Sequence, residues 1–280
     1  MNRGLMVAAA LAIAATTCGR ATDVEGGNER PQETTVQENS IRATMQDYAF
    51  SVEGEAGAGE VLVEFTNRGD ELHDAIIGRL EEGKTLEDVQ RLLQGGPQGP
   101  PPPWFDDAPM DMGIVGPGET SGIVVDAEEG TYALLCFMTD PQGVPHAAQG
   151  MVQTFEVGPA GTSTEIQPDE QIVMSATGAE APRLSSGSSI LEVTNEAAQA
   201  GEVLVLQLAQ GRTLEDVESW FRRGQKGPVP ATFHGGTHAI EPGASAKLTF
   251  TLDPGRYSIV ASFGEGEDIR DIATEFTISA

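Results

Sequence analysis

The stretch TYALLCFMTDPQGVPHAAQGMVQTFEV (residues 131–157) decides both the fold and the chemistry that this chain can support. It begins with TYALLCF and ends with VQTFEV, two runs rich in strand-forming residues, which predict two β-strands. Between the strand cores lie Cys136, His146 and Met151, which offer a thiolate, an imidazole and a thioether. These soft and borderline donors favour copper over magnesium, calcium or manganese. The stretch therefore predicts two strands joined by a loop that carries three candidate ligands.

A fourth candidate ligand lies upstream, where His73 closes the run NRGDELH (67–73). Two histidines, one cysteine and a weak axial methionine are the donor set of blue-copper electron-transfer sites. Two of the four histidines of the chain belong to this set, and so does its only cysteine beyond the N-terminal segment. Four protein ligands leave no open position for a substrate, in contrast to catalytic metal sites. The pattern thus favours an electron carrier or a copper binder over an enzyme.

An internal repeat organises most of the chain. The matching segments are VEFTN (63–67) with LEVTN (191–195), LEEGKTLEDV (80–89) with LAQGRTLEDV (208–217), and EGTYALL (129–135) with PGRYSIV (254–260). The first two pairs have the same sequence offset, so no gap separates them. Two tandem copies of about 115 residues each follow, a usual domain size. We predict domains at 41–158 and 166–280.

Within each copy, short strand-forming runs bounded by Gly, Pro or Asp predominate, which is typical of an antiparallel sandwich. One helix is expected to interrupt each copy. Thr85 with Asp88, and Thr213 with Asp216, fit a helix N-cap followed three residues later by an acid. The apolar residues that follow recur at helical spacing. The sequence predicts an all-β protein of two tandem Greek-key β-sandwiches, each with one inserted helix.

The order of the candidate ligands resembles that of the cupredoxins, the family that includes plastocyanin, azurin and the type-1 copper domain of nitrite reductase. In that family the first histidine follows a strand and the other three ligands lie on the last loop. The resemblance covers roughly residues 41–158. It implies that His73 and His146 are imidazole ligands, Cys136 the thiolate and Met151 the axial thioether of one type-1 copper ion. Nine residues separate the cysteine from the second histidine, a longer gap than in the small electron carriers of the family.

The second copy lacks these ligands. The aligned pairs are His73 with Gly201, Cys136 with Ala261 and Met151 with Ile272, and the loop GEGEDIRD of the second copy contains no histidine. We therefore expect a degenerate copy without copper, which has a structural or docking role.

Two alternatives remain open. A cupredoxin-like sandwich without metal would serve as an adhesion or assembly module. A Cu(I) delivery protein would use Met110, Met112 and Met138 together with His73 and Met151, since thioethers suit Cu(I). Methionine, however, fills gaps in cores more often than it binds metal.

The surroundings of the histidines give two further expectations. Asp74, or backbone carbonyl groups, would fix the tautomer of a ligand imidazole. His234 and His238 lie in HGGTH, whose glycines predict a loop with surface histidines and no metal.

The N-terminal segment predicts export. Arg3 precedes an apolar stretch, Leu5 to Ala15, of about eleven residues, which is too short to span a bilayer. Residues 1–18 thus form a predicted export signal, and Cys18 resembles the lipidated cysteine of bacterial lipoproteins; ordinary cleavage upstream of it is the alternative. The polar and acidic residues 19–40 predict a disordered tether. The expected location is the cell envelope, as a lipoprotein, or the periplasm or extracellular space.

The charge of the chain limits its partners. Its net charge is −27, from 43 acidic and 16 basic residues. Such a surface cannot neutralise phosphates, which excludes nucleic acid as a direct partner. It also disfavours an anionic membrane, except through an N-terminal lipid anchor. A redox partner protein with a basic surface would be attracted, although solubility alone also explains the charge.

Overall fold

The structure, a computed structural model, describes residues 39–93, 102–107, 111–161, 165–264 and 270–279. Its strands follow from alternating apolar residues. In β3 (Gly59–Asn67) the side chains of Val61, Val63 and Phe65 are buried, and those between them are partly exposed. Because successive residues of a strand point to opposite faces, this alternation places one face of β3 on the core.

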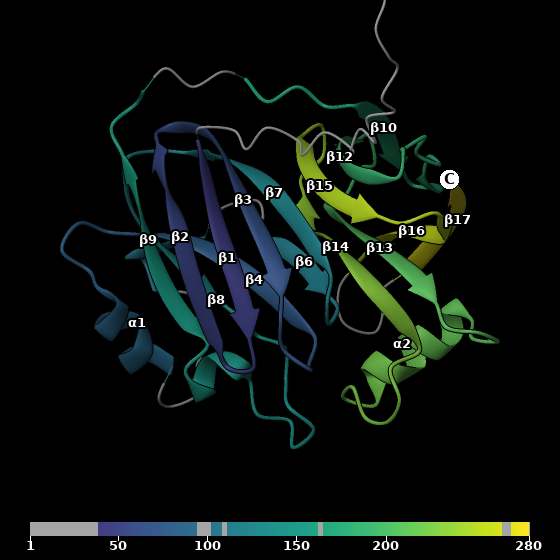
Figure 1. Ribbon diagram of the computed structural model, residues 1–280, viewed down its shortest axis with the longest axis horizontal. Helices are drawn as coiled ribbons and strands as arrows, with labels where there is room; N and C mark the ends of the chain where they lie inside the picture. Colours follow the sequence, from purple (N-terminus) through teal and green to yellow (C-terminus); the bar gives the residue numbers. More distant parts are fainter. Residues whose placement is uncertain (1–38, 94–101, 108–110, 162–164, 265–269, 280) are drawn as a thin grey trace, which may run out of the picture. The chain divides into compact units, whose positions relative to one another are not determined.

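The first half of the chain comprises strands β1 to β9. The bounds of the others are β1 (Ser40–Gln46), β2 (Ala49–Gly57), β4 (His73–Leu80), β5 (Phe105–Asp107), β6 (Met112–Val115), β7 (Thr120–Ala127), β8 (Gly130–Leu135) and β9 (Val152–Gly158). They pair in the orders β2–β1–β3–β7 and β6–β4–β8–β9, and Figure 1 shows β1 between β2 and β3. Ile41 and Phe65 of the first order share one core cluster with Ile77 and Leu134 of the second. The two sets of strands therefore pack face to face as a sandwich.

The second half repeats this pattern with strands β10 to β17. Their bounds are β10 (Glu170–Ser175), β11 (Gly178–Ala179), β12 (Gly187–Asn195), β13 (Gly201–Leu208), β14 (Ala231–Ile240), β15 (Ser245–Leu252), β16 (Gly255–Phe263) and β17 (Arg270–Ile278). The orders are β11–β10–β12–β15 and β14–β13–β16–β17. Corresponding strands pair in the same sense, including the parallel pairs β1–β3 and β10–β12. The all-β prediction and the repeat are confirmed.

The two halves share hydrogen-bonded strands. Strand β6 pairs with β14, and β7 pairs with β15. The contacts among the described residues of the two halves join them into one compact unit. The proposed domain boundaries, 41–158 and 166–280, therefore stay a prediction.

One helix lies in each half, as predicted: α1 (Leu86–Leu93) and α2 (Leu214–Arg222). Helix α1 packs against β9 (Figure 1), and its buried Val89 and Leu93 belong to a cluster that includes Ala147, the neighbour of His146. Helix α2 begins with a capping box. The Thr213 hydroxyl accepts the Asp216 N–H at 3.3 Å, and the Asp216 carboxylate accepts the Thr213 N–H at 2.9 Å.

Replacing Thr213 by alanine is expected to lower the free energy of unfolding by about 1 kcal/mol, because an N–H at the start of the helix loses its acceptor. Urea denaturation followed by circular dichroism measures this loss. Thr213→Ser keeps the hydroxyl and serves as the control, with a stability near that of the wild type. Equal stability of the alanine variant and the wild type would contradict the capping role.

The segment HGGTH differs from its prediction. It lies in strand β14, and His234 is buried, so the expectation of a surface loop is wrong. Gly235 and Gly236 have positive φ angles of 101° and 154°, and the pairing of β14 with β13 is irregular here. Glycine tolerates such angles, so the strand continues through an irregular stretch.

Several predictions fall on residues that the structure does not describe. These are the export signal (1–18) with Cys18, and the tether (19–40) except for its last two residues; Ser40 already begins β1. Met110 also lies outside the described residues. Neither described helix has the length and apolar character that crossing a bilayer requires.

Candidate metal centre

The fold brings the four predicted ligands to one end of the first half. His73 is the first residue of β4, and Cys136 directly follows the last residue of β8. His146 opens a 3₁₀ turn (His146–Gln149), and Met151 directly precedes β9. None of the four has exposed surface. Three of the four candidates thus lie on the connection between β8 and β9, and the fourth lies on β4, which pairs with β8.

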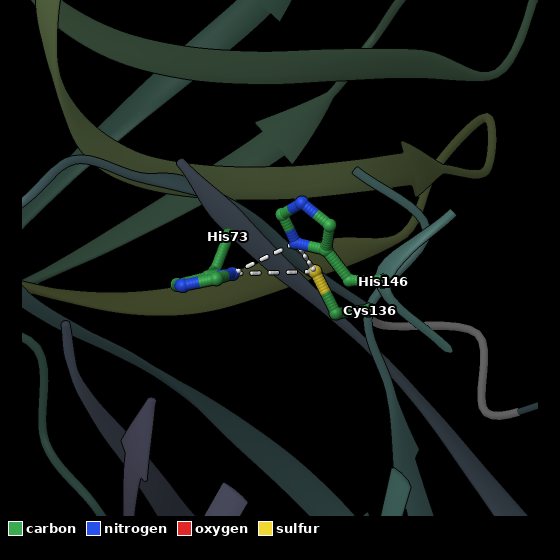
Figure 2. A group of neighbouring side chains, drawn as sticks. All are labelled: His73, Cys136 and His146. Carbon is green, nitrogen blue, oxygen red and sulfur yellow. Dashed lines mark hydrogen bonds between the residues drawn. The ribbon is translucent and has the colours of Figure 1, made fainter. Parts of the chain in front are cut away.

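Three donor atoms converge (Figure 2). The Nδ1 atoms of His73 and His146 are 3.1 Å apart, and they lie 3.7 Å and 3.5 Å from the sulfur of Cys136. Atoms that bind one ion at about 2.0–2.3 Å are separated from one another by roughly 3–4 Å. The observed separations fit a shared ion, so these residues could hold a metal ion with two imidazoles and a thiolate.

Met151 is held beside this cluster by its backbone. Its carbonyl oxygen accepts the Cys136 N–H at 3.3 Å, and its own N–H donates to the His146 carbonyl at 3.0 Å. The Ala147 N–H donates to the Cys136 carbonyl at 2.8 Å. The backbone therefore connects three of the candidate ligands directly, which suits the predicted axial role of the methionine.

The long gap between Cys136 and His146 is closed by its own hydrogen bonds. The Asp140 carboxylate accepts the N–H groups of Gln142 and Val144, both at 2.8 Å. The His146 N–H then donates to the Met138 carbonyl at 2.8 Å. The extra residues form a closed turn, and His146 returns to the sulfur in spite of the longer loop.

Two carboxylates contact the far nitrogens of the imidazoles. Asp47 Oδ1 lies 3.2 Å from His73 Nε2, and Glu71 Oε2 lies 2.9 Å from His146 Nε2. Glu71 and His146 are close, but their geometry does not form a hydrogen bond, so the carboxylate acts on this imidazole through its charge alone. A carboxylate at Nε2 favours the tautomer with its proton there, which leaves Nδ1 free for a metal.

The expectation for Asp74 is wrong. Its carboxylate accepts the Phe137 N–H at 2.8 Å and contacts neither imidazole at its Nε2. Asp47 and Glu71 were missed instead. Glu71 stands two residues before His73, a weak hint, but Asp47 belongs to a turn after β1 that only the folded chain brings near.

Burial sets the protonation of the cluster. It lowers the pKa of His73 from 6.5 to about 4; the neighbouring His146 acts in the same direction, and Asp47 opposes it. Burial also raises the pKa of the Cys136 thiol well above its ordinary value, as does the charge of Asp74. At neutral pH His73 is therefore ready to bind a metal, whereas Cys136 must give up a proton as it binds.

The other candidate ligands lie elsewhere. Met112 and Met138 are buried in the hydrophobic core, which favours packing over a Cu(I) delivery site. In the second half the ladder places Leu204 opposite Val260, as Ile76 lies opposite Leu135 in the first half. This register matches the alignment of His73 with Gly201 and of Cys136 with Ala261. Among the described residues, the cluster at His73 is the only group of metal-binding type.

A cleft lies beside the cluster. Its volume is about 480 Å³, and Asp70 and Glu71 line it together with Trp220 and Val229 of the second half. No Lys or Arg is among its lining residues. Glu71 thus lines the cleft and also contacts His146 of the buried cluster.

Comparisons with known proteins give structural neighbours only. No protein-family model matches the chain, and no curated protein matches it. Auracyanin from Roseiflexus castenholzii, reduced with dithionite, is 24% identical, with a TM-score of 0.31; the match covers 44% of this chain and 100% of auracyanin. A multicopper oxidase is 15% identical, with a TM-score of 0.24 and coverage of 86% and 88%. A copper-containing nitrite reductase from Thermus scotoductus SA-01 is 14% identical, with a TM-score of 0.22 and coverage of 79% and 56%.

TM-scores of this size assign no function. The order of strands and ligands is independent of them: His73 follows strand β3 after a short loop, and Cys136, His146 and Met151 lie on the connection between β8 and β9. This is the arrangement that the sequence resemblance implies. The chain has an all-β, cupredoxin-like fold.

Proposed function

We propose that this chain is an extracytoplasmic type-1 copper protein that transfers single electrons or holds copper. The convergence of His73 Nδ1, His146 Nδ1 and Cys136 Sγ in a site without exposed surface carries the proposal. One copper ion would bind to these three atoms, with Met151 as the axial ligand. Bound copper would supply a one-electron redox couple. The protein residues hold the donors in place and exclude water, so little rearrangement accompanies a change of charge.

The site is proposed to have no enzymatic activity. The four ligand side chains are fully buried, and the far sides of both imidazoles are covered by Asp47 and Glu71. A substrate would find no free coordination position there. Electrons, in contrast, can pass through a ligand to a partner that never touches the metal.

The proposed partner is a redox protein with a basic surface. The acidic residues of the cleft, Asp70 and Glu71, and the net charge of −27 favour such a surface through electrostatic steering. Glu71 lines the cleft and lies beside His146, so a partner at the cleft would be close to a candidate copper ligand. The proposed location is the cell envelope or the space outside the cytoplasm, with a lipid on Cys18 as the membrane anchor.

Titration of the metal-free protein with Cu(II) tests the copper site. We expect one equivalent to bind and to produce an intense visible band from thiolate-to-copper charge transfer, because a buried thiolate would be a direct ligand. Reduction should bleach this band, and reoxidation should restore it. A folded protein that binds no copper, or that binds it without the band, would favour the metal-free module. Rapid loss of Cu(I) to a chelator would favour copper delivery over electron transfer.

A further inference from the structure

A turn at residues 116–119 connects the second half to the region of the metal cluster. The Gly116 N–H donates to the Phe233 carbonyl at 2.7 Å, and Glu119 Oε2 lies 2.9 Å from His234 Nδ1. Phe233 and His234 belong to β14, and the His234 side chain is only 7% exposed. The second half therefore contacts this turn through both its backbone and a buried side chain.

The opposite side of the same turn is bonded to Asn67. The Asn67 N–H donates to the Glu119 carbonyl at 3.0 Å, and the Gly118 N–H donates to the Asn67 carbonyl at 2.9 Å. Asn67 is the last residue of β3 and has no exposed surface. Two backbone hydrogen bonds thus join the turn to Asn67.

The side chain of Asn67 shapes the loop that leads into the metal cluster. Its amide donates to the carbonyls of Glu71 at 2.8 Å and Val115 at 2.9 Å, and its oxygen accepts the Gly69 N–H at 2.9 Å. This loop places Glu71 beside His146 and ends at His73. Both N–H groups and the oxygen of the Asn67 amide are hydrogen-bonded within the protein, which fixes the course of the loop.

Strand β6 couples the halves at the same place. Val115 lies opposite His73 of β4 and also opposite His234 of β14. The backbones approach so closely that a Cβ atom on Gly113 would lie 2.9 Å from the carbonyl carbon of Gly236. The strand that bears His73 is therefore separated from the second half by a single, closely packed strand.

We propose that the second half is a positioning scaffold for the metal cluster, in which His234 and Phe233 hold the turn 116–119 and Asn67 transmits this constraint to Glu71 and His73. Asn67, Glu119 and His234 are then positioning residues. This role goes beyond the proposed function, because it concerns the copy that lacks the ligands. It explains what that copy contributes in the absence of a metal site of its own.

The second half contains the same asparagine arrangement without the ligands. The Asn195 amide donates to the carbonyls of Gln199 at 2.9 Å and Ile240 at 2.7 Å, and its oxygen accepts the Ala197 N–H at 2.8 Å. Gly201 follows there in place of a histidine. The arrangement thus belongs to the fold in both halves, and only in the first does it lead to a metal ligand. Asn195 is a matched control for Asn67.

The test compares two full-length variants that each remove a contact between the halves. His234→Leu removes the contact with Glu119. Lys247→Met removes the ion pair with Glu60 at 2.7 Å, whose two residues lie outside the loop 68–72 and the turn 116–119. Amide hydrogen exchange of residues 68–73 is measured in the metal-free proteins. We expect at least about tenfold faster exchange in His234→Leu and an unchanged rate in Lys247→Met. Unchanged exchange in His234→Leu, or equal acceleration in both variants, would overturn the proposal.

Three further variants extend this test. Glu119→Gln removes the charge with little change of shape, and it replaces His234→Leu if that variant does not fold. Asn67→Ser should accelerate exchange at 68–73 and shift the visible spectrum of the copper-loaded protein, whereas Asn195→Ser should do neither. A spectral shift of equal size in Asn195→Ser would show general loosening and contradict the positioning role. Hydrogen exchange needs no copper. The measurement therefore tests the positioning role even if the protein fails to bind copper.

Discussion

Replacement of Cys136 by serine is expected to abolish the visible charge-transfer band of the copper-loaded protein and to weaken copper binding by about 100-fold or more. A serine hydroxyl is a hard donor that does not ionise at neutral pH, so the strongest bond to copper is lost. The two imidazoles remain, with their Nδ1 atoms 3.1 Å apart. Residual weak binding without the band is therefore the expected behaviour. Absorption spectroscopy and a chelator competition titration measure the two effects.

Ala261→Ser is the matched control for this substitution. Ala261 occupies the equivalent position in the second half and is fully buried, like Cys136. Ala261→Ser therefore buries a hydroxyl, as Cys136→Ser does, but it leaves the four candidate ligands unchanged. We expect the control to lose stability and to keep the band. Persistence of the band in Cys136→Ser would mean that the sulfur is not a ligand, and the blue-copper proposal would fail.

The features that sequence predicted correctly are local or repeated. The strands on either side of Cys136 and Met151 are short apolar runs bounded by turn residues. The helix after Thr213 begins with a capping box, and before the other helix the Asp88 carboxylate accepts the Thr85 N–H. The repeat gave an independent check, because each element had to occur twice. The pairing of β8 with β9, which encloses Cys136, His146 and Met151, is the usual outcome for consecutive strands, and here it forms in spite of a long connection.

The features that sequence did not predict depend on long-range contacts. Asp47 is 26 residues from His73 along the chain, and its place beside the imidazole depends on the pairing of β1 with β3. No spacing rule connects these positions. The burial of His234 likewise depends on the pairing of β14 with β6, which no local pattern signals. Two glycines after His234 indicated a loop, whereas neighbouring strands kept the segment in the sheet.

The burial of His73 is also expected to make the stability of the metal-free protein depend on pH. The pKa of His73 is about 4 in the folded state, whereas an unfolded chain restores the ordinary histidine pKa of 6.5. Between these values the unfolded state binds the proton and the folded state does not, so stability falls as the pH falls. The contribution of neutral His73 to the free energy of unfolding is fully present above pH 6.5 and is lost as the pH falls through about 4. A shift of this size corresponds to about 3 kcal/mol.

The measurement is the free energy of unfolding of metal-free protein between pH 7.5 and pH 4, by urea denaturation. Carboxylates titrate in the same range, so the wild type must be compared with His73→Gln, which lacks the titrating group. The difference in stability between the two should change by about 3 kcal/mol across this range, with the wild type losing more as the pH falls.

His238 gives a control of opposite sign. Burial opposes its protonation, but the nearby Glu202 carboxylate outweighs this effect together with Asp74 and Asp111, and the pKa of His238 is raised above 6.5. Its contribution is fully present below pH 6.5 and is lost as the pH rises through the folded-state value. Relative to His238→Gln, the wild type should therefore gain stability as the pH falls. If His73→Gln followed the wild type in parallel at every pH, the pKa of His73 would be the same in the folded and the unfolded chain, and burial would not lower it.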